Sequence, residues 1–219
     1  DGVAIHPETR EMRYIAYNKP KNIVSTTALH RGEKRKTVRE MIPIEGHLFM
    51  IGRLDAESEG LMVLTNDGDL ANKVMHPRYR HTKTYKATVY GLPPQEIIDQ
   101  WEKGVDLGED GVTAPCSVRV LKRDKGFAIL QIIMTEGKKR QIRRVASQLG
   151  YPVRRLVRTH IGKLALGDMP PGQWREIEGS RCRATEQEQQ NDRGAFQHRE
   201  RCGRGEESNP APGATGQIS

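Results

Sequence analysis

Apolar and polar residues follow each other along this chain in short segments of strand length, separated by turn residues. Some segments are continuous apolar runs, and others alternate, so that Tyr85, Ala87 and Val89 fall on one face of an extended chain. Asp124-Lys125-Gly126 separates two such segments and predicts a hairpin. The predicted strands are residues 13–18, 48–52, 61–65, 84–90, 112–121, 127–135, 153–157 and 174–177.

Fewer segments have the spacing and end signals of helices. The clearest covers residues 139–149, where apolar residues recur at helical spacing and Gly150 follows. The other predicted helices are a short one opened by a capping box at 37–40 and ended by Pro43, one capped by Asp67 or Asp69 and running through Met75, and one over 95–103 ended by Gly104. This mixture predicts an α+β fold with a mixed, mostly antiparallel sheet and few helices.

Composition divides the 219 residues into three parts. Residues 180–219 are rich in Gln, Glu, Arg, Gly and Pro and contain few large apolar residues, so we expect a disordered tail. Residues 1–12 read as the end of a region that lies upstream. The remainder, 13–179, predicts one folded domain.

Several classes of protein are disfavoured by the sequence. The apolar runs are too short to span a membrane, and no charged-then-apolar leader opens the chain. The three cysteines are widely spaced, without a CxxC pair, which argues against a disulfide scaffold and a metal site. No P-loop or dinucleotide fingerprint is present, so we expect no cofactor. A reducing, cytoplasmic location follows from the cysteine usage.

The net charge of +8 is concentrated in one stretch of the chain. Residues 137–167 contain no acidic residue, and they carry Lys138, Lys139, Arg140, Arg143, Arg144, Arg154, Arg155, Arg158 and Lys163. Such a patch attracts polyanions, most often nucleic acid. The alternative is a solvated basic face, but the density and the absence of interleaved acids favour a polyanion partner.

Two segments carry candidate chemistry next to these basic residues. Arg53 and Asp55 stand two apart after an apolar strand, so they project to the same side, although a surface ion pair would give the same pattern. Lys83 and Tyr85 share a strand face in the same way, where the tyrosine is either a core residue or a ring that stacks on a base.

Taken together, these segments resemble the RsuA-type ribosomal RNA pseudouridine synthases. The resemblance runs from about residue 13 to 177, with its blocks in the order of the family. The blocks are Tyr17-Asn-Lys-Pro20, Gly52-Arg-Leu-Asp55, Ser58-Glu-Gly60, Thr65-Asn-Asp-Gly68, Lys83-Thr-Tyr85, Glu136-Gly137, Arg140-Gln-Ile-Arg-Arg144 and Arg155-Leu-Val-Arg158. One block departs slightly, because Gly137-Lys-Lys-Arg140 replaces the usual Gly-Arg-Asn-Arg.

The resemblance implies the pseudouridine synthase fold, with an active-site cleft across the sheet, and an enzyme that isomerises one uridine in RNA after flipping it. Asp55 is then the catalytic group, which either attacks C1′ or removes a ribose proton. Tyr85 packs on the uracil, and Arg143 forms an ion pair with Asp55. Arg53 fills the space of the flipped base, and Leu156 adds an apolar wall. The residues expected to bind the RNA backbone are Lys138, Lys139, Arg140, Arg144, Arg155 and Arg158.

The resemblance also sets expectations for partners. The substrate is ribosomal RNA or a pre-ribosomal particle, with 23S-type RNA expected and small-subunit RNA as the alternative. Chains of the family usually begin with an S4 RNA-binding domain. Asp1-Gly-Val-Ala-Ile5 looks like the last strand of that domain, and residues 1–12 are expected to be its residual end. We expect a monomer without membrane association, and neither metal nor cofactor, because isomerisation involves no redox change.

Two other functions use the same residues. A non-catalytic RNA-binding or ribosome assembly factor would need the basic patch alone. A metal-dependent nuclease could be built on acidic residues, which are Asp55, Glu57, Glu59, Asp67 and Asp69.

Overall fold

The computed structural model describes residues 11–26, 34–75 and 81–178, all of them within one compact unit that spans residues 1–186. Residues 1–10 of the expected domain remnant at 1–12, and all of the expected tail at 180–219, lie outside the described residues. No helix in the described part of the chain is long and apolar enough to cross a bilayer.

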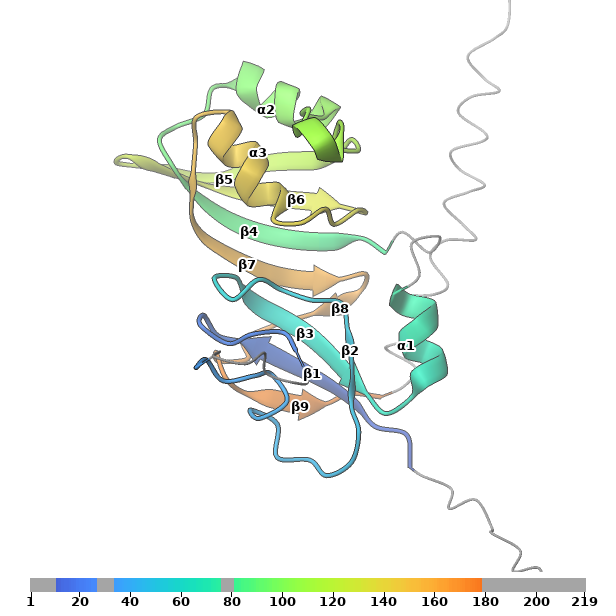
Figure 1. Ribbon diagram of the computed structural model, residues 1–219. Helices are drawn as coiled ribbons and strands as arrows, with labels where there is room; N and C mark the ends of the chain where they lie inside the picture. The colour runs from blue at the N-terminus through green and yellow to red at the C-terminus, as the bar shows by residue number, and fades with distance from the viewer. Residues whose placement is uncertain (1–10, 27–33, 76–80, 179–219) are drawn as a thin grey trace, which may run out of the picture. The chain divides into compact units, whose positions relative to one another are not determined.

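The described residues form one mixed sheet with three α-helices (Figure 1). The strands are β1 Tyr14–Lys19, β2 Phe49–Ile51, β3 Glu59–Thr65, β4 Lys83–Tyr90, β5 Ser117–Asp124, β6 Phe127–Met134, β7 Val153–Ile161, β8 Leu164–Ala165 and β9 Trp174–Glu176. The helices are α1 Gly68–Met75, α2 Gln95–Lys103 and α3 Gln141–Gln148, with a 3-10 turn η2 at Gly108–Asp110.

The sheet has nine strands and runs in the order β5-β6-β4-β7-β3-β1-β9, with β2 added to β3 and β8 added to β7. Every pairing between strands is antiparallel except that of β3 with β7. The mostly antiparallel α+β architecture predicted from the sequence is therefore confirmed. The parallel pair lies in the middle of the sheet, where it joins two halves that are each built from antiparallel strands.

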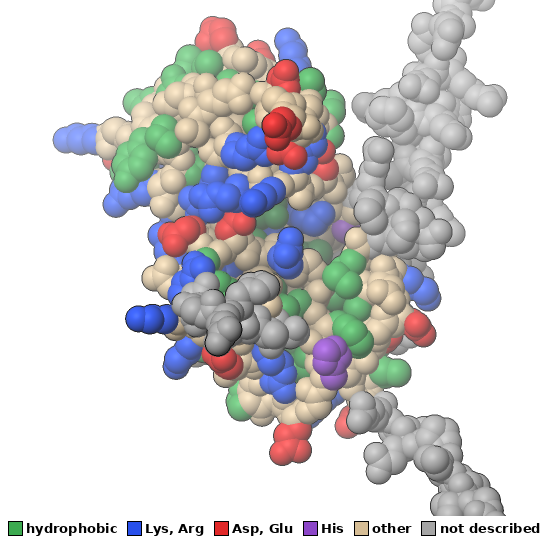
Figure 2. Space-filling model, viewed as in Figure 1, with side chains coloured by type: hydrophobic (Ala, Val, Ile, Leu, Met, Phe, Trp, Pro, Cys, Tyr) green, Lys and Arg blue, Asp and Glu red, His purple; other side chains and the backbone are tan. Residues whose placement is uncertain are grey.

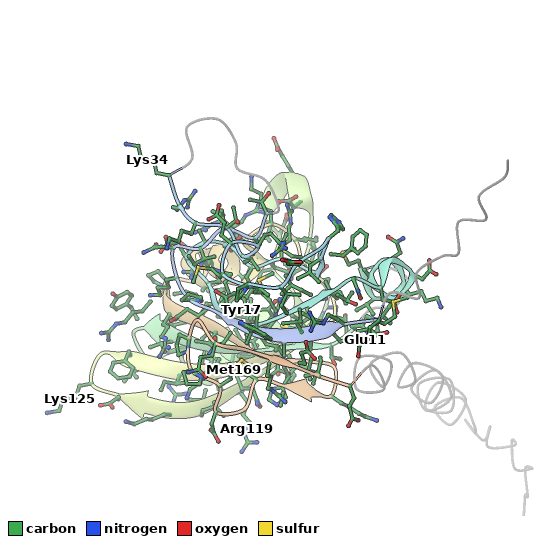
Figure 3. All side chains as sticks on the ribbon, turned by 90° about the horizontal axis from the view of Figure 1, so that it is seen from below. Glu11, Tyr17, Lys34, Arg119, Lys125 and Met169 are labelled. Carbon is green, nitrogen blue, oxygen red and sulfur yellow. The ribbon has the colours of Figure 1, made fainter. Side chains whose placement is uncertain are left out.

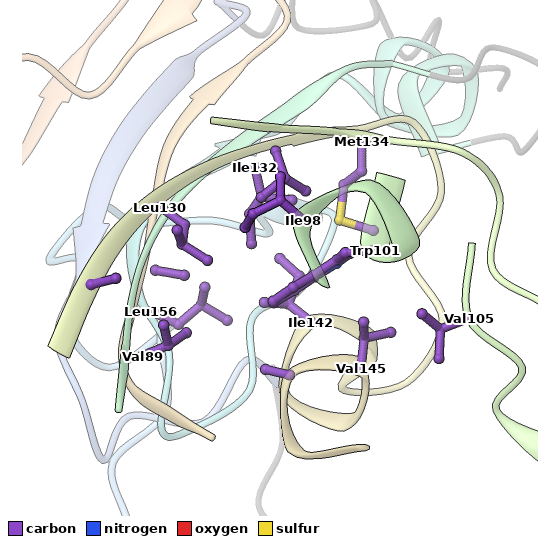
Figure 4. Close-up of a cluster of buried hydrophobic side chains, with 14 of the residues drawn as sticks. Val89, Ile98, Trp101, Val105, Leu130, Ile132, Met134, Ile142, Val145 and Leu156 are labelled. Carbon is purple, nitrogen blue, oxygen red and sulfur yellow. The ribbon is translucent and has the colours of Figure 1, made fainter. Parts of the chain in front are cut away.

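Alternation along β3 divides the apolar side chains between two faces. Leu61 and Val63 join one buried cluster with α1, and Met62 and Leu64 join another beneath the connection from β1 to β2. On the other half of the sheet, α2 and α3 cover β4, β6 and β7 (Figure 4). Tyr85 packs against both this third cluster and that of Met62, so it lies where the two layers meet.

Some predicted elements differ in extent from those observed. The capping box at Thr37 and Glu40 forms, with Thr37 N donating to Glu40 Oε2 (3.0 Å) and Glu40 N to Thr37 Oγ1 (3.2 Å). It is followed by a turn rather than by the predicted helix, because Pro43 leaves room for only a few residues. The strand predicted from residue 112 begins at Ser117, after Pro115, and β8 was not predicted.

Candidate active site

Asp55 lies in the connection between β2 and β3, residues 52–58, which we call the Asp55 loop. Each backbone carbonyl of residues 53–57 accepts a hydrogen bond. The donors are Arg158 Nη1 to Arg53 (3.4 Å), Ser25 Oγ to Leu54 (2.8 Å), Ser58 N to Asp55 (3.0 Å), Lys19 Nζ (3.3 Å) and Asn22 N (2.9 Å) to Ala56, and Arg143 Nη2 to Glu57 (2.8 Å). The loop is therefore held from both halves of the sheet, which fixes the position of its carboxylate.

The Asp55 carboxylate lies among cationic side chains. Its Oδ2 atom is 3.9 Å from Arg140 Nη1, and the Asp55 side chain is 34% exposed. Burial lowers the pKa of both Lys19 and Arg143, and the charge of Asp55 opposes this lowering at each, so both groups lie within its electrostatic reach. Three positive charges from β1 and the α3 region thus surround one carboxylate.

The predicted ion pair between Arg143 and Asp55 is wrong in this structure. Arg140 makes that contact, while Arg143 Nη2 donates to the Glu57 carbonyl and lies 3.5 Å from Ser58 Oγ. Burial lowers the pKa of Arg143. Two acceptors of the Asp55 loop occupy the Arg143 Nη2 atom, and the buried Nε has no hydrogen-bond partner among the described residues, whereas the turn before α3 directs Arg140 towards the carboxylate.

Arg140 has a left-handed backbone conformation, with φ 51° and ψ 30°, at the residue that precedes α3. A residue with a Cβ atom pays about 1–2 kcal/mol for this conformation. Neighbouring bonds enforce it, because Gln141 accepts from Lys138 N (3.0 Å) and donates to Glu136 (2.5 Å). Strain of this kind is typical of positions where function fixes a side chain. The helix predicted from residue 139 therefore begins at Gln141.

Tyr85 and Leu156 lie across the sheet from the Asp55 loop. Gly60, at the start of β3, pairs with Arg158 on β7, and Arg158 pairs in turn with Tyr85 on β4. Two strand spacings place the backbone of Tyr85 roughly 10 Å from that of Gly60, which follows the loop on β3. Leu156 is buried two residues before Arg158 on the same side of β7, in the cluster that α2 and α3 cover, and its role as an active-site wall stays a prediction.

The sequence analysis gave no role to Lys19, which is fully buried at the end of β1. Its Nζ atom donates to the carbonyls of Pro20 (2.9 Å), Ile23 (2.9 Å) and Ala56 (3.3 Å). Burial lowers the pKa of Lys19 to about 8, against the opposing effect of Asp55. A lysine at the end of an otherwise apolar strand, in Asn18-Lys19-Pro20, is the signal that could have identified it.

The predicted RNA-binding residues fall into two groups. Lys139, Arg140 and Arg155 have exposed side chains, and Figure 2 shows Lys and Arg gathered across the face that carries α3. Arg155 pairs with Glu59 (2.7 Å). Lys138 and Arg144 instead bind the segment around η2, through the carbonyls of residues 110–112 and through Asp110.

Arg158 does not lie on that surface. Only 2% of it is exposed, so Arg158 is not one of the exposed cations of that face, and its role in RNA binding stays a prediction. Its Nε donates to the Leu61 carbonyl (2.8 Å) and its Nη1 to that of Arg53. The side chain lies on the inward face of the sheet, because β7 continues to Ile161 rather than ending at Val157. Arg53, by contrast, has an exposed side chain at the edge of the Asp55 loop.

The acidic residues of the nuclease hypothesis have other structural roles. Asp67 caps α1 through Leu70 N (2.9 Å) and accepts from the Tyr14 hydroxyl (2.9 Å). Glu59 pairs with Arg155 and Asp55 with Arg140. Among the described residues, no three His, Cys, Asp or Glu side chains lie close enough to hold a metal ion.

Comparison with known proteins agrees with this geometry. Residues 13–148 match the family described as RNA pseudouridylate synthase. A crystal structure of a pseudouridylate synthase superposes with a TM-score of 0.71 at 26% identity, covering 80% of this chain and 74% of that one.

Proteins of similar sequence come from several bacteria. An RNA pseudouridine synthase of Aquifex aeolicus (strain VF5) is 40% identical over 81% of this chain and 70% of its own. Ribosomal large subunit pseudouridine synthase E of Vibrio parahaemolyticus is 37% identical, over 78% of this chain and 76% of its own. Ribosomal large subunit pseudouridine synthase B of Bacillus subtilis is 39% identical, over 78% of this chain and 70% of its own. The chain therefore belongs to the RNA pseudouridylate synthase family, in its RsuA-type branch, and is an isomerase.

Proposed function

We propose that this protein converts one uridine of large-subunit ribosomal RNA to pseudouridine, with Asp55 as the catalytic group. The arrangement around Asp55 supports this proposal, because a carboxylate on a fixed loop faces Arg140 at 3.9 Å. Two of the relatives described above are named as ribosomal large subunit synthases, which favours that RNA as substrate. Residues 13–179 act as the catalytic domain, as a monomer in the cytoplasm.

The reaction breaks the bond between N1 and C1′, turns the base, and joins C5 to C1′; C5 then loses its proton and N1 takes one up. Asp55 acts at the ribose, and the cationic side chains of Arg140 and Arg143 keep its charge localised there. Tyr85 supports the flipped uracil against the apolar wall of Leu156. Arg53 occupies the space that the base leaves in the RNA.

Asp55→Asn tests the assignment, because it keeps the shape of the side chain and removes its charge. We expect release of tritium from C5-labelled uridine in ribosomal RNA to be abolished, while RNA binding and the melting temperature change little. Asp99→Asn is the matched control, since Asp99 lies exposed on α2. Clear tritium release by Asp55→Asn would refute the role of Asp55.

Carbodiimide-dependent primer stops on ribosomal RNA then locate the product. RNA incubated with the wild-type protein should gain one stop in large-subunit RNA that Asp55→Asn does not produce. A new stop in small-subunit RNA alone would contradict the proposed substrate.

A further inference from the structure

A pocket of about 500 Å³ lies beside the Asp55 loop, between β2, α1 and the start of β4. One part of its wall is apolar and includes Phe49, Met75 and Ile161. The other part is basic and includes Arg53, Lys83 and Arg158. None of the described residues that line it is acidic. The volume is within the range of pockets that hold small molecules.

No carboxylate of the described residues forms an ion pair with the two inner cations of this pocket, Lys83 and Arg158. Arg158 is 2% exposed, and its buried Nη2 atom has no hydrogen-bond partner among the described residues. Within the described part of the chain, Lys83 Nζ donates to two backbone carbonyls, at 3.3 Å to His81 and 3.4 Å to Thr135. Burial and the charge of Arg158 both lower the pKa of Lys83. Two like charges are thus partly desolvated side by side, at a cost that a bound anion would offset.

The pocket adjoins the reacting centre without including it. Arg53 lines the pocket and precedes Asp55 by two residues, and Arg158 pairs with Tyr85 across the sheet. Asp55 and Tyr85 themselves are not part of its lining. In Figure 2 hydrophobic side chains lie beside Lys and Arg side chains on this face of the molecule.

We propose that this pocket binds a phosphate of the substrate RNA together with the adjoining nucleoside, next to the uridine that reacts at Asp55. Lys83 and Arg158 face the phosphate, and the apolar wall of Phe49 and Met75 contacts the nucleoside. This inference rests on the proposed function, because it takes RNA as the ligand. A bound phosphate explains why Lys83 and Arg158 are buried in a pocket whose described lining contains no acidic residue.

Titration calorimetry with inorganic phosphate and with uridine 5′-monophosphate tests the pocket directly. Lys83→Gln removes a pocket cation, and Lys86→Gln is the matched control, because Lys86 lies exposed on the same strand. We expect Lys83→Gln to weaken binding of both probes at least about tenfold. Lys86→Gln should change it less than about twofold. Equal binding by wild type and Lys83→Gln would overturn the proposal.

A second variant separates the pocket from the reacting centre. Met75→Trp adds bulk to the pocket from α1, where Met75 is 45% exposed, so the core is little disturbed. It should weaken binding of uridine 5′-monophosphate, and unchanged binding would place that ligand elsewhere. In RNA binding, Lys83→Gln should lower the slope of log affinity against log salt by about one.

Pseudouridine formation, measured on the same proteins, distinguishes the two proposals. Phosphate binding that survives in both variants overturns the pocket and leaves the proposed function intact. If the wild-type protein binds phosphate in the pocket but forms no pseudouridine, the proposed function is overturned while the anion site stands.

Discussion

Gly60 on β3 faces the backbone of Arg158 on β7 so closely that a Cβ atom at Gly60 would lie 2.6 Å from the Arg158 nitrogen. Gly60 also has a φ of 109°, which residues with a side chain rarely adopt. The contact joins the two halves of the sheet directly below the Asp55 loop. The architecture of the site therefore depends on the absence of a side chain at residue 60.

Gly60→Ala should lower the free energy of unfolding by about 3 kcal/mol or more, because backbone atoms must move to admit the methyl group. Gly172→Ala is the control, since Gly172 has a φ of 86° but no atom within 4 Å of the added Cβ. The free energy of unfolding of that variant should fall by only about 1 kcal/mol, because of backbone strain. Urea unfolding measures both, and equal losses would show that the close approach is unimportant.

Arg140→Gly should separate activity from stability. Glycine relieves the left-handed strain, and the lost ion pair is partly exposed, so the free energy of unfolding should stay within about 1 kcal/mol of wild type. Turnover should fall at least about tenfold, because the cation beside Asp55 is removed. Arg140→Lys keeps the charge and should retain more turnover than Arg140→Gly. Full turnover by Arg140→Gly would contradict a role for this contact.

Arg143→Ala should lower both the turnover and the stability of the protein. The Glu57 carbonyl loses its donor, which costs about 1–3 kcal/mol of unfolding free energy, and turnover should fall about 100-fold. Arg119→Ala is the matched control. Arg119 is exposed on β5, where it alternates with the buried Val118, and Figure 3 shows it at the edge of the molecule. If the two variants melt at the same temperature, Arg143 does not support the Asp55 loop.

Lys19 should make stability depend on pH. Its pKa is about 8 in the folded protein and 10.5 as the unperturbed value, so between these the unfolded chain holds a proton that the folded chain has released. The free energy of unfolding contributed by this group therefore rises with pH across that window. Burial raises the pKa of Cys116 to about 11 and of Tyr17 to about 12, and these groups act in the opposite direction.

Comparison with Lys19→Met isolates the lysine, because Cys116 and Tyr17 are present in both proteins. The difference in unfolding free energy, wild type minus variant, should increase between about pH 7 and pH 9.5, by at most about 1.4 kcal/mol per pH unit. Urea unfolding at the two pH values measures it. A difference that stays constant or decreases would contradict the lowered pKa of Lys19.

Local patterns in the sequence predicted most of the architecture. Helix α2 has the predicted bounds, because Pro94 and Gly104 mark its ends. Asp67 caps α1 as one of the two candidates. The helix predicted after Thr37 does not form, because Pro43 leaves too few residues for it. Strand β8 was not predicted, because its two residues are too few to show an alternating pattern of apolar and polar positions.

The site was less predictable, because its key contacts join residues far apart in the chain. The sequence motifs indicated that Asp55, Arg140 and Arg143 share one site. Which arginine contacts the carboxylate depends on the left-handed backbone of Arg140 and on the carbonyl of the Asp55 loop to which Arg143 donates. In the sequence, Arg158 looks like one more surface cation of a basic stretch. It is buried because of the register of β7 between β3 and β4, which local patterns do not show.

The bonds that fix the Asp55 loop also determine when, during synthesis, the loop can be fixed in full. Arg143 and Arg158 come 86 and 105 residues after the carbonyls to which they donate. A nascent polypeptide leaves the exit tunnel with Asp55 already made but without these two donors. The loop can gain its full set of hydrogen bonds only after translation has passed residue 158.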